Sequence, residues 1–131
     1  MMDKKILLGN EAIAYGILAG GANLVASYPG TPASEVCGAA MDLVKKHKLP
    51  CHVEWSINEK TAVEIAFANA IANRRSAAIM KQVGLNVASD PVISAAYMGT
   101  TGGFLLVVAD DPGPHSSQTE QDTRLMARLA K

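Results

Sequence analysis

The chain has 131 residues, of which 49% are hydrophobic and 18% are charged, and this composition is typical of a globular domain and excludes a disordered chain. Twelve basic residues balance twelve acidic ones and are scattered along the sequence, which argues against nucleic-acid binding. The longest apolar runs are too short for a transmembrane helix or a signal peptide, so we expect a cytoplasmic protein without a membrane partner. Cys37 and Cys51 form no CxxC pair, so neither a zinc site nor an iron–sulfur site is predicted.

Short apolar runs alternate along the chain with longer segments of helical period. The expected strands are Lys5–Leu8 (or a lead-in), Leu24–Ser27, Cys51–Trp55, Ser76–Gln82 and Phe104–Ala109. Caps are expected at Asn10, Thr31 and Asn58, with Pro32 at the first position of its helix. The expected helices are Glu11–Ala19, one from Pro32 that frays at residues 45–48, Glu59–Asn73, one from Ser89 or Asp90 to about Met98, and one over about Gln118–Leu129.

This alternation predicts an α/β fold: a doubly wound, mainly parallel sheet with helices on both faces. Ligands of such sheets bind beyond the carboxyl ends of the strands. These ends are expected at residues 27–31, 55–59, 82–86 and 109–114, which are also the Gly-, Pro- and polar-rich points of the sequence.

Three acidic residues, Glu54, Glu59 and Glu64, cluster around the third expected strand and its helix. Glu59 stands at the helix start, where a desolvated carboxyl could act as an acid–base group; a solvated acid that complements the helix dipole is the simpler interpretation. His115 lies in a loop after the last strand and is the histidine best placed to meet a ligand. No GxGxxG, GxxxxGK[ST] or GxSxG motif occurs at the expected strand ends, so the residues alone do not name a reaction.

At these edge loops the sequence resembles the N-terminal domain of the alpha subunit of indolepyruvate:ferredoxin oxidoreductase, a family of thiamine-diphosphate-dependent 2-oxoacid:ferredoxin oxidoreductases. The matching segments, in order along the chain, are Leu8–Ala12, Tyr28–Pro32, Glu54–Lys60, Met80–Asn86 and Val107–Gly113, followed by Ser116–Gln118 and Glu120–Asp122. The combination is specific, although each piece alone would be weak.

The resemblance implies the pyrimidine-binding half of a thiamine diphosphate site. It places the family's cofactor glutamate at Glu59, where a carboxyl group hydrogen-bonds the aminopyrimidine ring and assists proton removal from the cofactor. Such a group needs shielding from water, so we expect Glu59 to be buried at an interface. Gly84, Leu85 and Asn86 match the loop that packs on the pyrimidine ring, and Thr31 matches a threonine that touches the oxoacid.

The chain departs from the family pattern in two ways. Pyruvate-specific relatives carry an arginine for the substrate carboxylate after the last strand, where this chain has Asp110 and Asp111, so we expect that contact from His115 or from the helix start at Thr31. The chain also has no GDG-type loop and no cluster cysteines. We therefore expect another domain to bind the diphosphate and Mg²⁺, iron–sulfur clusters elsewhere in the full enzyme, and residues 1–131 to be a single pyrimidine-binding domain from a larger or split enzyme.

The resemblance implies oxidative decarboxylation of indolepyruvate or another arylpyruvate to an acyl-CoA, with ferredoxin as electron acceptor. Two alternatives stay open: a subunit of a split thiamine-diphosphate decarboxylase of the sulfopyruvate or phosphonopyruvate type, and a non-catalytic α/β assembly module. Alanines 62, 66 and 70 recur at every fourth position of the Glu59 helix, and we expect this stripe to be an exposed face that pairs two copies in a homodimer.

Overall fold

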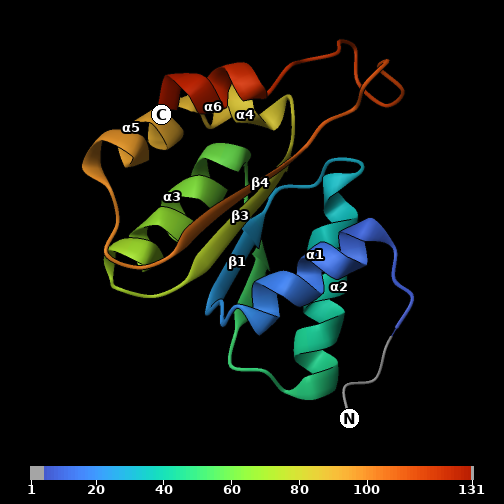
Figure 1. Cartoon of the computed structure of the whole chain (residues 1–131), viewed down its shortest axis with the longest axis vertical. Helices are drawn as coiled ribbons and strands as arrows, with labels where there is room; N and C mark the ends of the chain where they lie inside the picture. The colour runs from blue at the N-terminus through green and yellow to red at the C-terminus, as the bar shows by residue number, and fades with distance from the viewer. Residues whose placement is uncertain (1–4, 131) are drawn as a thin grey trace.

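The structure is a computed structural model that describes residues 5–130, and within them four parallel strands form one sheet with six helices along its faces (Figure 1). The strands are β1 (Leu24–Ser27), β2 (His52–Trp55), β3 (Ser76–Lys81) and β4 (Phe104–Ala109). The helices are α1 (Gly9–Ala19), α2 (Ala33–His47), α3 (Glu59–Ile71), α4 (Gly84–Val87), α5 (Ser89–Met98) and α6 (Arg124–Ala130). The predicted α/β fold class is confirmed.

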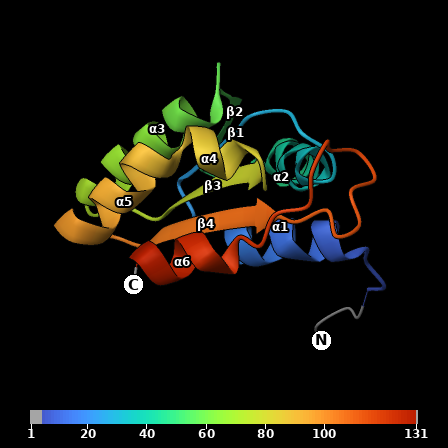
Figure 2. The ribbon, with the colours of Figure 1, turned by 90° about the horizontal axis from the view of Figure 1, so that it is seen from above.

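The strand order β2-β1-β3-β4 places a change of direction at the centre of the sheet. Strand β1 leads into α2 on one face, whereas β3 leads into α4 and α5 on the other, as the view from above shows (Figure 2). The two connections therefore diverge beyond the carboxyl ends of β1 and β3. In open parallel sheets this switch point is where ligands bind.

Two apolar cores lie on the two faces of the sheet, and strand β3 contributes to both. Ala77 and Ile79 pack with α1 and α2, whereas Ala78 and Met80 pack with α3, α4 and α5. All six residues of β3 are buried, which is the pattern of a central parallel strand covered on both faces. The unbroken apolar run in this part of the sequence correctly predicts such a strand.

The alanine stripe of α3 does not form an exposed face. Ala62, Ala66 and Ala70 are all fully buried within the chain, because their small side chains let α3 approach the sheet closely. The Ala66 carbonyl accepts a hydrogen bond from the hydroxyl of buried Ser76 on β3. The predicted dimer surface is therefore wrong, and the homodimer stays a prediction without it.

The predicted starts of the first two helices are also wrong. Residues 5–8 form no strand, and α1 begins one residue before Asn10, with Leu8 as its N-cap. Helix α2 begins at Ala33 rather than Pro32, and the turn before it is closed by Ser34: its hydroxyl accepts from the Gly30 N–H at 2.8 Å, and its own N–H donates to the Gly30 carbonyl. The Asn58 cap of α3 is confirmed, since its Oδ1 accepts from Thr61 N–H at 2.8 Å.

The last helix starts six residues later than predicted. Residues 116–121 are tied to the sheet by side-chain hydrogen bonds, including one from Gln121 Nε2 to the Gln82 carbonyl at 3.2 Å, so this stretch cannot coil into a helix. Helix α6 begins only after Asp122, whose carboxylate accepts the Arg124 N–H. Within residues 5–130, no helix is long and apolar enough to cross a membrane.

The double burial of β3 makes a stability prediction. Ile79→Ala removes a fully buried side chain and should lower the free energy of unfolding by about 2–5 kcal/mol, because a cavity adds to the lost burial. Ile57→Ala, at a side chain that is 82% exposed, should change it by no more than about 0.5 kcal/mol. Urea unfolding of both variants measures the difference, and equal effects would contradict this assignment of the core.

Candidate functional site

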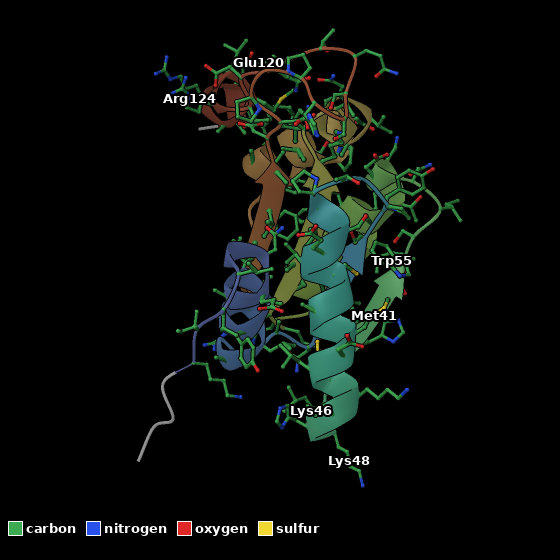
Figure 3. The ribbon with its side chains drawn as sticks, turned by 90° about the vertical axis from the view of Figure 1, so that its right-hand side faces the viewer. Met41, Lys46, Lys48, Trp55, Glu120 and Arg124 are labelled. Carbon is green, nitrogen blue, oxygen red and sulfur yellow. The ribbon has the colours of Figure 1, made fainter. Side chains whose placement is uncertain are left out.

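The loops at the carboxyl ends of the strands meet at the switch point between β1 and β3. The turn after β1 carries Gly30 and Thr31, and the turn after β3 carries Gly84. A Cβ on Gly30 would stand 2.9 Å from the Cβ of Lys81, so the turn after β1 lies directly on the end of β3. Residues 110–123 join β4 to α6 (the β4–α6 loop), and they cross the same end of the sheet. In Figure 3, Glu120 of this loop lies at the opposite end of the molecule from Lys48, the residue that follows α2.

Glu59 is the first residue of α3, and its half-buried side chain lies against Gly84. A Cβ on Gly84 would come within 2.5 Å of both Cγ and Oε1 of Glu59, so only glycine leaves room for the carboxylate at this place. Among residues 5–130 no hydrogen bond uses this carboxylate. The structure thus brings together two residues that the sequence placed in one site, and it leaves the acid available to a ligand.

The other two residues of the predicted ring-packing loop face elsewhere. Leu85 is 2% exposed and belongs to the apolar core beneath α4, where it packs with Val63 and Val92. The Asn86 amide donates to Gln121 Oε1 at 2.8 Å and so holds the β4–α6 loop. The Leu85 and Asn86 side chains therefore hold the turn after β3 in place. Gly84 is the residue of this turn that contacts Glu59.

Asp111 organises the β4–α6 loop. Its Oδ2 accepts hydrogen bonds from Ser116 N–H at 2.8 Å, Ser117 Oγ at 3.1 Å and His115 N–H at 3.2 Å. These donors, the Ser116 N–H foremost, hold the pKa of Asp111 below its ordinary value. Asp111 therefore folds the loop back on itself.

Lys81, which the sequence analysis did not single out, is buried at the end of β3. Its side chain is 9% exposed, its Nζ donates to Ser116 Oγ at 2.6 Å, and Asp111 Oδ2 lies 3.8 Å away. Ser116 Oγ is also 3.4 Å from the Thr31 carbonyl oxygen, so the lysine reaches the turn after β1 through one hydroxyl group. The signal in the sequence was a lysine closing an otherwise apolar strand.

Gln82 follows Lys81 and is fully buried. Its Nε2 donates to Ser117 Oγ at 2.8 Å, but no group of residues 5–130 forms a hydrogen bond with its Oε1. A buried amide oxygen without a donor is costly, and it marks a place where a polar group is missing.

The remaining predicted residues lie in the open. Thr31 has an exposed side chain in the turn after β1, and the exposed His115 contributes its backbone N–H to Asp111. Both lie at this end of the sheet, and their contact with a substrate carboxylate stays a prediction. Within residues 5–130 no group of three or more His, Cys, Asp or Glu side chains could hold a metal ion, and both cysteines are free thiols.

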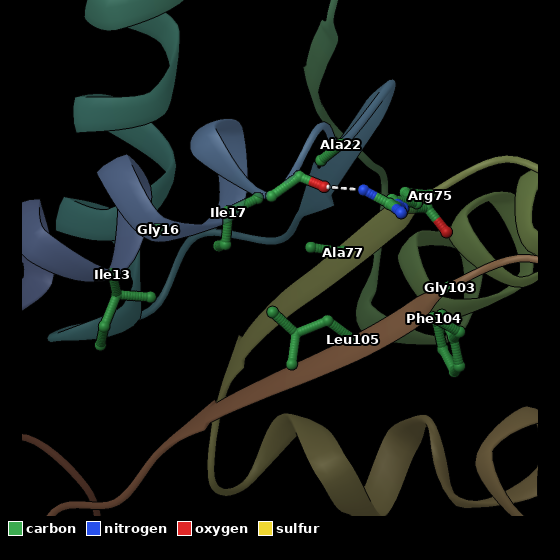
Figure 4. A pocket seen from close by; sticks show the side chains of 11 residues that line it. Ile13, Gly16, Ile17, Ala22, Arg75, Ala77, Gly103, Phe104 and Leu105 are labelled. Carbon is green, nitrogen blue, oxygen red and sulfur yellow. Dashed lines mark hydrogen bonds between the residues drawn. The ribbon is translucent and has the colours of Figure 1, made fainter.

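A separate apolar pocket lies at the opposite end of the sheet. It has a volume of about 390 Å³ and opens between α1 and the amino ends of β3 and β4, lined among others by Ile17, Ala77 and Leu105 (Figure 4). Arg75 closes one side and donates to the Gly20 carbonyl at 2.7 Å. None of the residues that line it belongs to the site around Glu59.

Known proteins are similar to this chain in sequence and in fold, although no protein-family model matches it. It is 49% identical to the indolepyruvate oxidoreductase subunit IorA of Archaeoglobus fulgidus and 47% identical to that of Pyrococcus horikoshii. Each match covers 98% of this chain, and the chain spans about a fifth of these relatives: 21% and 19% of their length. The chain is therefore homologous to a part of IorA subunits.

A solved structure supports the fold. The 2-oxoglutarate:ferredoxin oxidoreductase from Magnetococcus marinus, solved with 2-oxoglutarate, coenzyme A and succinyl-CoA bound, matches with a TM-score of 0.75 at 23% identity. The match covers 85% of this chain and 19% of that chain. The predicted family resemblance and fold are thus confirmed.

The contact between Gly84 and Glu59 makes a prediction. Gly84→Ala should lower the free energy of unfolding by about 1–3 kcal/mol, because the new methyl group overlaps the Glu59 side chain and must displace it. Gly38→Ala on α2, where a Cβ would meet no atom within 4 Å, should instead be neutral or stabilising by up to about 1 kcal/mol. Urea unfolding of both variants is the measurement, and a harmless G84A would show that Glu59 is not held there.

The hydrogen bonds of Asp111 predict a dependence on pH. Its lowered pKa in the folded protein means that its ionised form stabilises the fold above the unfolded pKa of about 3.9, and that this contribution is lost as the pH falls below it. Asp111→Asn should therefore be less stable than the wild type at pH 7, with the difference shrinking toward pH 2. Urea unfolding at both pH values measures this, and a difference that is the same at both would contradict it.

Proposed function

We propose, from the relation of this chain to IorA subunits, that residues 1–131 form the pyrimidine-binding domain of a thiamine-diphosphate-dependent indolepyruvate:ferredoxin oxidoreductase. The reaction would be oxidative decarboxylation of an arylpyruvate to an acyl-CoA, with electrons passing to ferredoxin through iron–sulfur clusters elsewhere in the enzyme. The names of the relatives and of the structural neighbour support this class over a split decarboxylase that needs no ferredoxin.

The observation that carries the proposal is the placement of Glu59 against Gly84 beside the switch point of the sheet. The acid starts α3, and the glycine starts α4, so two helix starts bring a carboxylate and an open backbone together. The carboxylate has no hydrogen-bond partner among residues 5–130, which leaves it able to share a proton with a ring nitrogen. This arrangement supports the binding of an aminopyrimidine ring at Glu59.

The residues present fit the cofactor. The absence of a Cβ at Gly84 leaves room for the Glu59 carboxylate, and among residues 5–130 the buried Oε1 of Gln82, two residues earlier in the same turn, has no hydrogen-bond partner. When bound, thiamine diphosphate supplies a nucleophilic carbon and an electron sink for decarboxylation. The part of this chain is to hold the proton at the Glu59 carboxyl, to support the ring with the turn that begins at Gly84, and to place Thr31 near the substrate.

We place the diphosphate and Mg²⁺ on a second domain or subunit that covers this end of the sheet. Three exposed apolar side chains lie close to Glu59 or Gly84 along the chain: Ile57 two residues before Glu59, Val87 at the end of α4, and Trp55 at the end of β2, which Figure 3 labels. Such side chains mark a surface that another protein surface covers. Covering it would also remove Glu59 from bulk water, which its proton-sharing role needs.

Replacing the acid tests the proposal in the assembled enzyme. Glu59→Gln should lower the cofactor-dependent turnover of indolepyruvate by at least about 100-fold, because the amide cannot share a proton with the ring. Turnover is measured by reduction of ferredoxin, and calorimetry with thiamine diphosphate and Mg²⁺ measures binding to the same assemblies.

The matched control is Glu64→Gln, which neutralises an exposed acid on the same helix and should keep the wild-type rate. Full turnover in E59Q would remove the proposed role of Glu59. Failure of the wild-type assembly to bind thiamine diphosphate would instead favour a non-catalytic assembly module.

A further inference from the structure

We propose that Lys81 binds the carboxylate of the 2-oxoacid substrate, a role that rests on the function proposed above. The sequence analysis expects this contact from His115 or from the helix start at Thr31, and in the structure both side chains are exposed. A buried cation, Lys81, reaches the same end of the sheet from the central strand.

The first argument is the burial of the charge. The Lys81 side chain is 9% exposed, and burying an ammonium group is unfavourable unless other groups compensate for the water it loses. Asp111 balances the charge from 3.8 Å, which is beyond hydrogen-bond distance. The Asp111 carboxylate thus offsets part of this cost without accepting a hydrogen bond from the lysine.

The second argument is the unfilled donors. An ammonium group has three N–H donors, and within residues 5–130 one of them has an acceptor, Ser116 Oγ at 2.6 Å. Asp111 Oδ2 is itself engaged by backbone and hydroxyl donors of the β4–α6 loop. A carboxylate offers two oxygens to the two remaining donors, and hydrogen bonds between charged groups are the strong ones.

The third argument is position. Ser116 Oγ joins Lys81 Nζ to the carbonyl of Thr31, so the ammonium and the proposed substrate threonine lie on either side of one hydroxyl group. Three residues after Lys81 the chain reaches Gly84 and its contact with Glu59. A 2-oxoacid held by its carboxylate at Lys81 would therefore lie at the same end of the sheet as the acid of the proposed cofactor site.

The competing interpretation is that Lys81 only fastens the β4–α6 loop. Both roles use the hydrogen bond to Ser116, but they differ in what replacing Lys81 changes. If Lys81 only holds the β4–α6 loop, its loss would weaken the binding of cofactor and substrate together. Loss of a carboxylate-binding cation would change the affinity for anionic substrates and leave the affinity for the cofactor as it was.

The test compares Lys81→Met with wild type in the assembled enzyme, using indolepyruvate as substrate and its uncharged methyl ester as inhibitor. We expect KM for indolepyruvate to rise roughly 10- to 100-fold, and the preference of the wild type for the acid over the ester to be lost. Calorimetry should give thiamine diphosphate affinities within about twofold of each other. The control Ser117→Ala removes a loop contact to Gln82 and Asp111 without removing the cation, and it should retain the preference for the acid.

Each outcome decides one question. An unchanged KM and an unchanged preference for the acid in K81M would overturn the proposal while the function proposed for the domain stands. Equal losses of cofactor and substrate affinity would also overturn it, in favour of the competing interpretation. A wild-type assembly that binds no thiamine diphosphate would overturn the proposed function and this role of Lys81 with it.

Discussion

The burial of strand β3 on both faces fixes what happens at the end of the sheet. Helices α1 and α2 cover one face of this strand, and α3, α4 and α5 cover the other. All six of its residues are therefore buried, up to the switch point. Its last residue, Lys81, and the next one, Gln82, are therefore polar groups carried into the interior. Buried polar groups must find partners, and this requirement shapes the loops around them.

The β4–α6 loop supplies most of those partners. Ser116 and Ser117 accept hydrogen bonds from Lys81 and Gln82, and Asp111 gathers the donors that keep both serines in place. A loop that would otherwise move freely over the strand ends is thereby held across them. The partnering is incomplete, however: Gln82 Oε1 and two donors of Lys81 have no acceptor or donor among residues 5–130. Buried polar groups with unused hydrogen-bonding capacity are consistent with the ligand site proposed at this end of the sheet.

The sequence predicts the fold well because the apolar runs mark the buried strands and so fix the order of strands and helices along the chain. The strands Leu24–Ser27 and Phe104–Ala109 agree with prediction to the residue, and the Asn58 cap fixes the start of α3. Prediction fails where tertiary contacts override local preference. The alanines of α3 show the period of a helix but not which partner they face, and the sheet proved to be that partner.

The candidate site could be predicted only in part for the same reason. The resemblance predicts that Glu59 and Gly84 belong to one site, and the contact between the Glu59 side chain and Gly84 supports that prediction. The burial of Lys81 could not be predicted from its place at the end of an apolar strand, because a lysine there is ordinarily solvated. Its burial depends on Ser116 and Asp111, 35 and 30 positions further along the chain. Loop contacts of this kind leave no periodic pattern in a sequence.

The same reasoning supports the proposal that a second protein surface covers this end of the sheet. The Lys81 side of the switch point is covered by the β4–α6 loop, whereas the Glu59 side is bordered by exposed Ile57 and Val87. A site that stabilises charge transfer needs low dielectric on every side, since water would screen the carboxylate and the ammonium alike. The β4–α6 loop thus covers the Lys81 side of the site, whereas the Glu59 side is exposed. The proposed partner domain would cover Ile57 and Val87 on that side and so enclose the Glu59 carboxyl group.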